Sequence, residues 1–342
     1  MTVKRPDQQE RALAELVAGL RSQSSLLNKC DLQLVGREFP LNPFPHQGPA
    51  ALVGDDAALV PATGGQDLLL ACDGIDTVLA AEDPWFAGWS AVLVNLSDIA
   101  AMGGRPIALV NSLWSGDTEP AGLMFAGMAA ACERFAVPMV GGHTNLHSPY
   151  AALAVAVLGR LPGPPLSVHR TRPGDELLLL VNIAGRFHRH YPFWDAASEA
   201  DPTLLRRQLK LPSLLATRGL VQGAKDISMG GLGGTAVMYA ETARLGLEID
   251  LEAIHPPRGV GLERWMHCFP SFGFLLSCHQ GQRAAIGALI GDDPTLELAP
   301  IGQFAEGSAV RLRQGEHTAV LWDWGDQPLM GLAPPHPSRP VG

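Results

Sequence analysis

Aspartate residues end two apolar segments in the first half of the chain, and a carboxylate in such a position needs a partner. Asp55 and Asp56 follow one apolar run, and Asp73 follows the next, Leu68–Cys72. Burying an unpaired carboxylate is costly, and few lysines or arginines lie nearby in the sequence. A divalent metal ion is therefore the favoured partner for these carboxylates, because aspartate oxygens suit Mg²⁺ ions that bridge phosphate groups.

A polar pair lies inside an apolar helical segment, residues 89–102. Asn95 and Asp98 are three positions apart, so they share one face of a helix. The apolar residues around them predict a buried carboxylate, which favours a ligand. The alternatives stay open, because a single aspartate is commonly a turn or helix cap and a polar pair is commonly an exposed helix face.

Glycines open a helical segment in the second half of the chain, at residues 230–234. The free N–H groups of a helix start can hold an anion, so an anion site is the favoured interpretation and tight packing is the alternative. No apolar strand is predicted before these glycines, which argues against a Rossmann dinucleotide site. The chain has no G-x-x-x-x-G-K-[ST] sequence, which excludes a P-loop.

The elements that must position these residues alternate between apolar runs and helical patterns, which predicts an α/β protein. The first helix spans residues 8–22 and has Leu13, Leu16, Val17 and Leu20 on one face. The further segments are predicted as strands at 68–72, 107–113, 137–140, 151–158, 176–182, 247–251 and 272–278, and as helices at 89–102, 121–135, 203–221, 233–245 and 282–290.

The Pro- and Gly-rich sequence at residues 161–165 is the best candidate for a linker. A chain of 342 residues is long for one core and suits two domains. The expected segments are an N-terminal helix and loop at 1–49, a first domain at 50–162, a second domain at 166–327 and a flexible tail at 328–342.

Composition excludes several classes of protein. The net charge of −9 and the absence of basic runs argue against a nucleic-acid partner. No apolar stretch approaches the ~20 residues of a membrane span, and the polar N-terminus carries no secretory signal. The five cysteines are scattered, as expected of thiols in a reducing compartment rather than of a zinc site. We therefore expect a cytoplasmic protein.

Five sequence elements, in order, resemble the aminoimidazole-ribonucleotide (AIR) synthase-like superfamily. Gly54–Ala58, Asp73 and the run Asn95–Pro106 resemble the N-terminal domain of thiamine-monophosphate kinase. Gly141-Gly-His-Thr144 is similar to a segment of selenophosphate synthetase. Lys225–Thr235 is similar to the Asp-Ile-Ser-Asp-Gly-Gly-Leu element of the same superfamily.

The resemblance covers roughly residues 50–310 and implies a fold, a cofactor and a site. The implied fold has a first domain that forms a β-barrel shared across a homodimer, and a second α/β domain. ATP and Mg²⁺ are the implied cofactors, with metal ligands at Asp55, Asp56, Asp73 and Asp98. The implied nucleotide site adds Asn95, Gly141, Gly142, Thr144, Gly230 and Gly231, with Asp226 and His143 as catalytic residues and the acceptor between the domains near Asp226.

The chain departs from these relatives at informative positions. His143 stands where the kinase has an aspartate, and Met229 stands where many relatives have one. The Gly-Glu-Asp-Tyr-Glu-Leu segment expected of the kinase is absent, and Phe269–Leu276 occupies the comparable region. The favoured function is ATP- and Mg²⁺-dependent phosphoryl transfer, by a kinase or a synthetase, to an unidentified small metabolite. The alternative is a nucleotide-binding regulatory or inactive module, because the two departures remove metal oxygens.

Overall fold

The computed structural model describes residues 8–45, 51–62 and 65–332, and its chain forms two compact units. Unit 1 combines residues up to 55 with 167–194 and 221 onward, and unit 2 combines residues 56–166 with 195–220. Two mixed α/β units agree with the predicted fold class. The N-terminal helices belong to unit 1 and residues 195–220 belong to unit 2, and the expected consecutive domain boundaries stay a prediction.

Unit 2 is built on one five-stranded sheet with the strand order β1-β2-β5-β3-β4. All neighbouring strands are antiparallel except β3 and β4, which are parallel. The strands are β1 (Ala58–Val60), β2 (Leu68–Gly74), β3 (Arg105–Trp114), β4 (Met139–Asn145) and β5 (Ala152–Arg160). The helices of this unit are α4 (Thr77–Glu82), α5 (Pro84–Ala101), α6 (Thr118–Phe135) and α7 (Pro202–Thr217).

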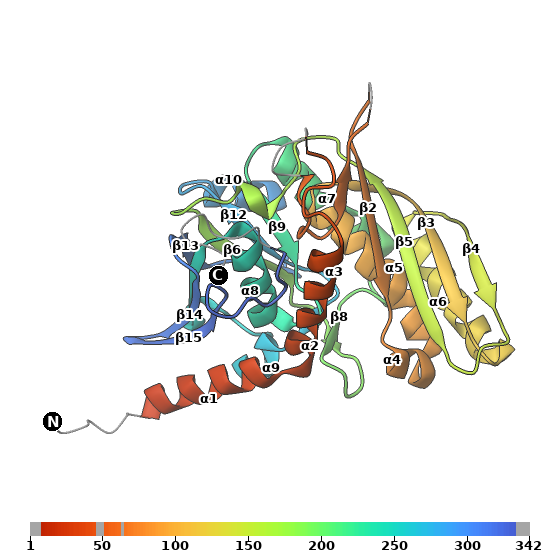
Figure 1. The fold of residues 1–342 in the computed structure, drawn as a ribbon, viewed down its shortest axis with the longest axis horizontal. Helices are drawn as coiled ribbons and strands as arrows, with labels where there is room; N and C mark the ends of the chain where they lie inside the picture. The colour runs from red at the N-terminus through yellow and green to blue at the C-terminus, as the bar shows by residue number, and fades with distance from the viewer. Residues whose placement is uncertain (1–7, 46–50, 63–64, 333–342) are drawn as a thin grey trace. The chain divides into compact units, whose positions relative to one another are not determined.

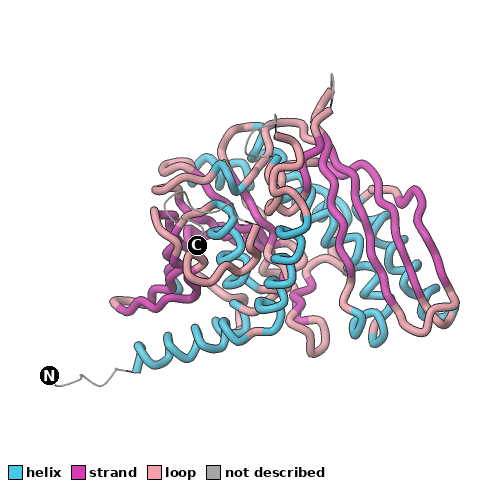
Figure 2. The backbone as a smooth tube through the Cα atoms, in the orientation of Figure 1, coloured by secondary structure: helices cyan, strands magenta, loops and turns pink. Residues whose placement is uncertain are grey.

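Helices cover one face of this sheet (Figure 2). α5 packs against β2, β3 and β5, α6 packs on α5, and α7 contacts both helices. Because side chains alternate along a strand, Leu69 and Val157 point to the helices and are buried. The opposite face is exposed and carries the apolar side chains Leu70, Val110, Val140 and Leu158.

The sheet of unit 2 is open, with β1 and β4 as its edges. No closed barrel therefore forms among the described residues of one chain. The expected barrel is one shared across a homodimer, and it stays a prediction.

Unit 1 is built on a seven-stranded sheet with the order β15-β14-β10-β13-β6-β12-β9 (Figure 1). Its strands are β6 (Glu176–Asn182), β9 (Gly223–Asp226), β10 (Gly246–Asp250), β12 (Gly273–Cys278), β13 (Leu296–Ala305), β14 (Ala309–Gln314) and β15 (His317–Asp323). A small sheet adds β7 (Arg186–Phe187), β8 (Phe193–Asp195) and β11 (Phe269–Pro270). The helices are α1 (Gln8–Ser22), α2 (Ser24–Leu27), α3 (Leu32–Glu38), α8 (Gly231–Ala243), α9 (Leu262–Met266) and α10 (Arg283–Ile290), with short 3₁₀ turns η1 (Asn28–Asp31), η3 (Val168–Arg170) and η4 (Leu251–Ala253).

Burial explains why the central elements of unit 1 form where they do. β6 is a continuous apolar run whose residues 177–182 are all buried, as expected of a central strand. α1 has the predicted bounds and packs on β14 and β15 through Leu13, Val17 and Leu20, whereas Leu16 is half-buried. Within the described residues, no helix is both long enough and apolar enough to cross a membrane.

The end of the described chain is anchored to α8. The Glu241 carboxylate accepts hydrogen bonds from the backbone N–H groups of Leu329, Met330 and Gly331, the shortest at 2.7 Å. Leu329 and Met330 are buried. Residues 329–332 therefore differ from the flexible tail expected from 328, and the rest of that tail, from 333, lies outside the described residues.

Candidate functional site

Two buried polar residues of the predicted site lie on α5 in unit 2. α5 begins at Pro84 behind Asp83, whose carboxylate accepts a hydrogen bond from the Phe86 N–H at 3.3 Å. Asn95 is fully buried and Asp98 is 8% exposed, as their apolar neighbours in sequence predict. Asn95 Nδ2 donates to the Ala91 carbonyl at 2.8 Å, which leaves Asn95 Oδ1 buried and without a hydrogen-bond partner among the described residues.

Asp73 lies near the end of β2, on the helix-covered side of the sheet. Its backbone pairs with Val155 of β5, and neighbours in register point to the same face. Val155 is fully buried under the helices, whereas Asp73 is exposed because the strand ends there. The structure thus places Asp73 and the Asn95–Asp98 pair on the same side of one sheet.

His143 lies on the other side of that sheet. The predicted run Gly141, Gly142, His143 and Thr144 forms most of the edge strand β4. His143 pairs with Ser112 of β3, and Ser112 pairs with Ala154 of β5. Ala154 is next to Val155 in the strand, so its side chain points to the opposite face of the sheet. Its ring lies 5.8 Å from the Trp114 ring on the exposed face. Within one chain, the structure therefore does not bring His143 together with Asp73.

Asp55 belongs to unit 1 and is held by its own hydrogen bonds. Ser167 Oγ donates to Asp55 Oδ2 at 2.5 Å, and the Val168 N–H donates to Oδ1 at 2.9 Å. Burial raises the pKa of the Asp55 carboxyl, and His169 is the largest of the groups that oppose this rise. These bonds fix the start of η3, so Asp55 has a structural role whether or not it also meets a metal.

Lys225, on β9, was not among the site residues predicted from the sequence. It is 6% exposed on β9, and its Nζ donates to the Gly54 carbonyl at 3.4 Å. A charged amine in that position lies beside the Asp55 loop, and its charge lowers the pKa of Asp55. The signal that the sequence offered for Lys225 is its position directly before the predicted site residue Asp226.

Asp226 ends β9 and is buried. This strand precedes the glycine-rich helix start and was not assigned from the sequence. The four residues Gly-Ala-Lys-Asp give no apolar run, which is why the pattern missed the strand. β9 is antiparallel to its neighbour β12, so the surrounding sheet still lacks the parallel order of a Rossmann site.

Gly230 caps α8 and Gly231 is its first residue. Gly231 has a φ of +64°, and a Cβ there would lie 2.4 Å from the Met266 carbonyl oxygen. Farther along, Gly233 and Gly234 face Leu20 and Leu26 of the N-terminal helices. Close packing within unit 1 therefore accounts for these glycines, which was the alternative to an anion site.

The candidate metal-ligating atoms are oxygens, the type of ligand that Mg²⁺ prefers. Asp56, Asp73 and Asp98 supply carboxylates, and the unpartnered Asn95 Oδ1 is a buried acceptor that a metal-bound water would satisfy. Among the described residues, no three His, Cys, Asp or Glu side chains form a group that could hold a metal ion. Mg²⁺ commonly keeps several waters and uses one or two carboxylates together with substrate phosphates, so this arrangement suits a nucleotide-bound ion.

Comparison with known families decides the relationship. Residues 54–161 match the AIR synthase related protein, N-terminal domain, and residues 172–314 match its C-terminal domain. The chain belongs to this family. Membership of the AIR synthase related proteins confirms the resemblance seen in the sequence elements.

Relatives of this AIR synthase related protein include uncharacterized and enzymatic proteins. An uncharacterized protein of Synechocystis sp. is 41% identical over 321 residues, which cover 94% of this chain and 98% of that protein. The thiamine-monophosphate kinase of Synechococcus elongatus is 26% identical over 300 residues, which cover 80% of this chain and 90% of the kinase.

Two solved structures show the same fold. The PurL of Thermotoga maritima complexed with ATP has a TM-score of 0.67 at 18% identity, over 82% of this chain and 47% of the PurL chain. AaThiL complexed with AMPPCP and TMP has a TM-score of 0.59 at 21% identity, over 78% of this chain and 90% of that one. At these identities the likeness concerns the fold alone.

Proposed function

We propose that this chain is an ATP- and Mg²⁺-dependent phosphotransferase or synthetase that acts on a small metabolite. The observation that carries the proposal is the buried pair on α5, where Asp98 and the unpartnered Oδ1 of Asn95 offer oxygen atoms inside an apolar helix. The relationship to a thiamine-monophosphate kinase supports this class of reaction, and the fold shared with PurL complexed with ATP is consistent with it.

The proposed roles follow from the chemistry of the side chains. Asp73 and Asp98, with Asp56, would hold Mg²⁺ and orient the nucleotide. When bound, Mg²⁺ neutralises the charge that shifts between phosphate oxygens during transfer. The work of the protein is then positioning and electrostatic stabilisation. Asp226, buried at the end of β9, is proposed to orient the acceptor.

The glycine-rich segments are proposed to contact the nucleotide, with less structural support than the aspartates have. Gly141, Gly142 and Thr144 would approach the phosphates through the backbone of β4, and His143 would act from the exposed face of the sheet. Gly230 and Gly231 remain candidate contacts at the start of α8. Both are buried, Gly231 against Met266 and Gly230 against Gly234, so a nucleotide would reach them only if that packing opened.

Turnover of ATP with a panel of acceptors tests the proposal. Purified protein is incubated with ATP, Mg²⁺ and metabolites that carry hydroxyl, phosphate or amide groups, and ADP release is measured. We expect one acceptor class to stimulate ADP release, and we expect Asp98→Asn to abolish the stimulation. Stimulation that survives both Asp98→Asn and removal of Mg²⁺ would contradict the assignment.

A nucleotide-binding module without turnover is the second candidate. It is favoured by the position of His143 on the face opposite Asp73 and by the absence of a three-residue metal cluster among the described residues. This candidate predicts that ATP binds in the presence of Mg²⁺ and that no acceptor in the panel stimulates ADP release. The same assay, combined with calorimetry, separates the two functions.

A further inference from the structure

Three consecutive residues of unit 1, Val53, Gly54 and Asp55, are held by groups from elsewhere in that unit. Because a carbonyl oxygen only accepts, His169 Nε2 donates to the Val53 carbonyl, at 3.4 Å. Lys225 Nζ donates to the next carbonyl, that of Gly54, also at 3.4 Å. This loop is therefore fixed to η3 through His169 and to β9 through Lys225.

Gly54 also packs directly on α8. It has a φ of +117°, and a Cβ at this position would lie 2.7 Å from Cγ2 of Thr242, a residue that is 1% exposed. A larger residue than glycine would have to displace α8. The contact between the Gly54 carbonyl and the Lys225 ammonium is therefore set by closely packed backbone.

Hydrogen-bond donors surround the Asp55 carboxylate on the same loop. Ser167 Oγ donates to Oδ2 at 2.5 Å and the Val168 N–H donates to Oδ1 at 2.9 Å, so both oxygens already accept a bond. A Mg²⁺ ion needs oxygen ligands in an octahedral arrangement, whereas hydroxyl and amide donors occupy lone pairs that the ion would use. The groups around Asp55 therefore suit a carboxylate that the protein itself holds.

Lys225 brings a positive charge to this loop from the interior of unit 1. It is 6% exposed, and its backbone is fixed in register with Leu275 of β12. A buried ammonium is costly unless an anion lies near it. Burial raises the pKa of the Asp55 carboxyl, and the charges of His169 and Lys225 act against this rise. The lysine and the aspartate therefore stabilise each other's charged forms.

From these contacts we infer that Lys225 and Asp55 form an internal charge pair that anchors the loop, and that Asp55 binds no Mg²⁺. Lys225 supplies at Asp55 the positive charge that a metal ion would otherwise supply. The next residue in the chain is Asp56, one of the proposed Mg²⁺ ligands, so the pair fixes the backbone from which that ligand extends. Both are thus positioning residues. Their effect on Mg²⁺ rests on the proposed function, whereas the pairing rests only on contacts inside unit 1.

Melting in the absence of nucleotide and metal tests the pairing, on wild type, Asp55→Asn, Lys225→Met and the double variant. We expect each single variant to melt several degrees below wild type, because it leaves a buried charge without its partner. The double variant should lose less than the sum of the two single losses, since neither charge remains. If a single variant fails to fold, a folded double variant shows the same rescue. A double variant that loses the full sum or more, or that fails to fold, would overturn the pairing.

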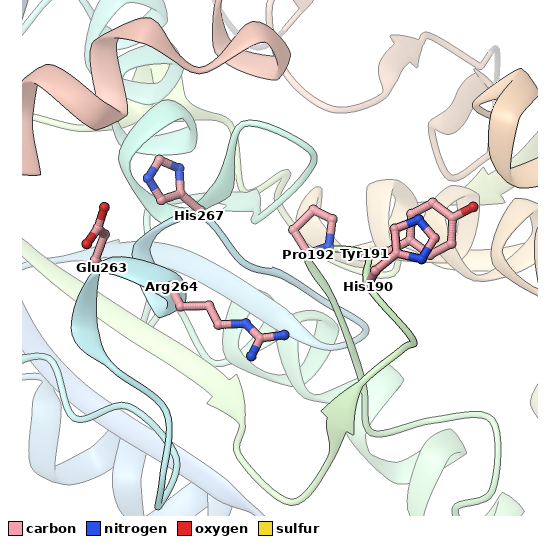
Figure 3. Close-up of a pocket in the computed structure, with 6 residues that line it drawn as sticks. All are labelled: His190, Tyr191, Pro192, Glu263, Arg264 and His267. Atoms are coloured by element: carbon pink, nitrogen blue, oxygen red, sulfur yellow. The ribbon is translucent and has the colours of Figure 1, made fainter.

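Arg264 provides the control for loss of a positive charge in unit 1. Its guanidinium lies 3.7 Å from the centroid of the Phe187 ring. Figure 3 shows its side chain extending from α9, with the rings of His190 and Tyr191 directed away from it. The surrounding pocket of about 320 Å³ is lined by His190, Tyr191, Pro192, Glu263, Arg264 and His267. This lining includes neither Asp55 nor a residue that holds it, so the losses in Asp55→Asn and Arg264→Gln should add.

Binding of Mn²⁺, counted by electron paramagnetic resonance with a non-hydrolysable ATP analogue present, tests the positioning role. We expect Asp55→Asn and Lys225→Met each to weaken Mn²⁺ binding by about tenfold, the scale of losing a residue that orients a metal ligand. The double variant should recover Mn²⁺ affinity to within about threefold of wild type, because no ligand has been removed. If Asp55 were a ligand, the double variant would stay weak, and that result would overturn the inference.

The sign of the change in Lys225→Met gives a second test. An ammonium that only repelled a metal ion at Asp55 would, when removed, allow tighter Mn²⁺ binding. Tighter or unchanged binding in a folded Lys225→Met protein would therefore overturn the positioning role. Absence of Mn²⁺ binding in wild type would instead contradict the proposed function, and the melting comparison, which uses no nucleotide or metal, decides the pairing in that case as well.

Discussion

His143 is the residue at which this chain departs most clearly from the thiamine-monophosphate kinase pattern, and its substitution makes a specific prediction. On the exposed face of β4, its imidazole would ligate a metal or donate to a phosphate. We expect His143→Ala to weaken ATP·Mg²⁺ binding by about tenfold, or ~1.4 kcal/mol. His143→Asp should retain binding, because it restores an oxygen ligand.

Calorimetry checks this pair of variants, with His147→Ala as the control. His147 is an exposed histidine four residues along the chain, so its loss should not change affinity. If His143→Ala binds ATP·Mg²⁺ as wild type does, the residue has no part in the nucleotide site.

Glu241 makes a prediction about pH. Burial raises the pKa of its carboxyl, against three backbone hydrogen bonds. The folded state therefore holds this proton more tightly than the unfolded state does. The stability contributed by the protonated group is fully present below the unfolded pKa and is lost as pH rises through the folded one. We expect the free energy of unfolding of wild type, relative to Glu241→Gln, to fall as pH rises above ~4.3, the ordinary glutamate pKa.

Urea denaturation at a series of pH values measures this difference, whose steepest slope for one proton is about 1.4 kcal/mol per pH unit. Glu306→Gln, at an exposed position, serves as the control and should show no such trend. A difference that grows with pH would mean that the hydrogen bonds from residues 329–331 outweigh burial.

At the residue scale, the sequence predicted which side chains are buried better than it predicted the face of the sheet to which a side chain points. Asp98 and Asn95 stand among apolar neighbours in a helix, and both are buried as expected. The face on which His143 points depends on where β4 begins and on its register with β3, which no single-chain pattern specifies. The hydrogen bonds that hold Asp55 come from residues 167 and 168, more than a hundred positions away.

At the element scale, the crossing of α5 and α6 is set by two glycines. A Cβ at Gly88 would lie 2.0 Å from the Met124 carbonyl oxygen, and one at Gly127 would lie 2.0 Å from the Trp85 carbonyl oxygen. Gly88→Ala should therefore force the helices apart and destabilise the protein by about 1–3 kcal/mol or more. The shift would also move Asn95 and Asp98, so nucleotide affinity should fall with stability.

Gly122→Ala on α6 is the matched control. A Cβ at Gly122 meets no atom within 4 Å, so alanine should stabilise the helix by about 0.5–1 kcal/mol. Thermal or urea unfolding measures both variants. Equal stability of the two alanine variants would show that the helices can separate without loss.

The strands differ in how well their sequence patterns predicted their positions. Residues 176–182 were predicted with the observed bounds, because a continuous apolar run bounded by polar residues is unambiguous. β4 was predicted at 137–140 and lies at Met139–Asn145, because its Gly-Gly pair and polar residues disfavour a strand until neighbours supply hydrogen bonds. β13, β14 and β15 were not assigned from the sequence at all, although they form one side of the sheet of unit 1.

At the scale of the whole molecule, the exposed apolar face of the sheet in unit 2 predicts a homodimer. Exposed apolar side chains gathered on one face mark interaction surfaces. If two copies packed through this face, the exposed face of each subunit would be covered by the other. We expect Val110→Lys, in the middle of that face, to give a monomer in analytical ultracentrifugation at micromolar concentration. Val320→Lys is the control, because Val320 is 40% exposed and Val110 is 42% exposed, and Val320 lies on β15 of unit 1.

A stable monomer of 36.3 kDa in the wild type would refute the homodimer, because interfaces that cover a whole sheet face are large and rarely dissociate. Dimers in both lysine variants would place the contact elsewhere.

We propose that Asp98 on α5 of this AIR synthase related protein holds a nucleotide-bound Mg²⁺. Calorimetric titration of ATP in the presence and absence of Mg²⁺, on wild type, Asp98→Asn and the exposed capping control Asp117→Asn, tests it most directly. We expect Mg²⁺-dependent binding that is retained in Asp117→Asn and lost in Asp98→Asn, whose amide keeps the size of the side chain but not its charge. Unchanged ATP·Mg²⁺ affinity in a folded Asp98→Asn protein would contradict it.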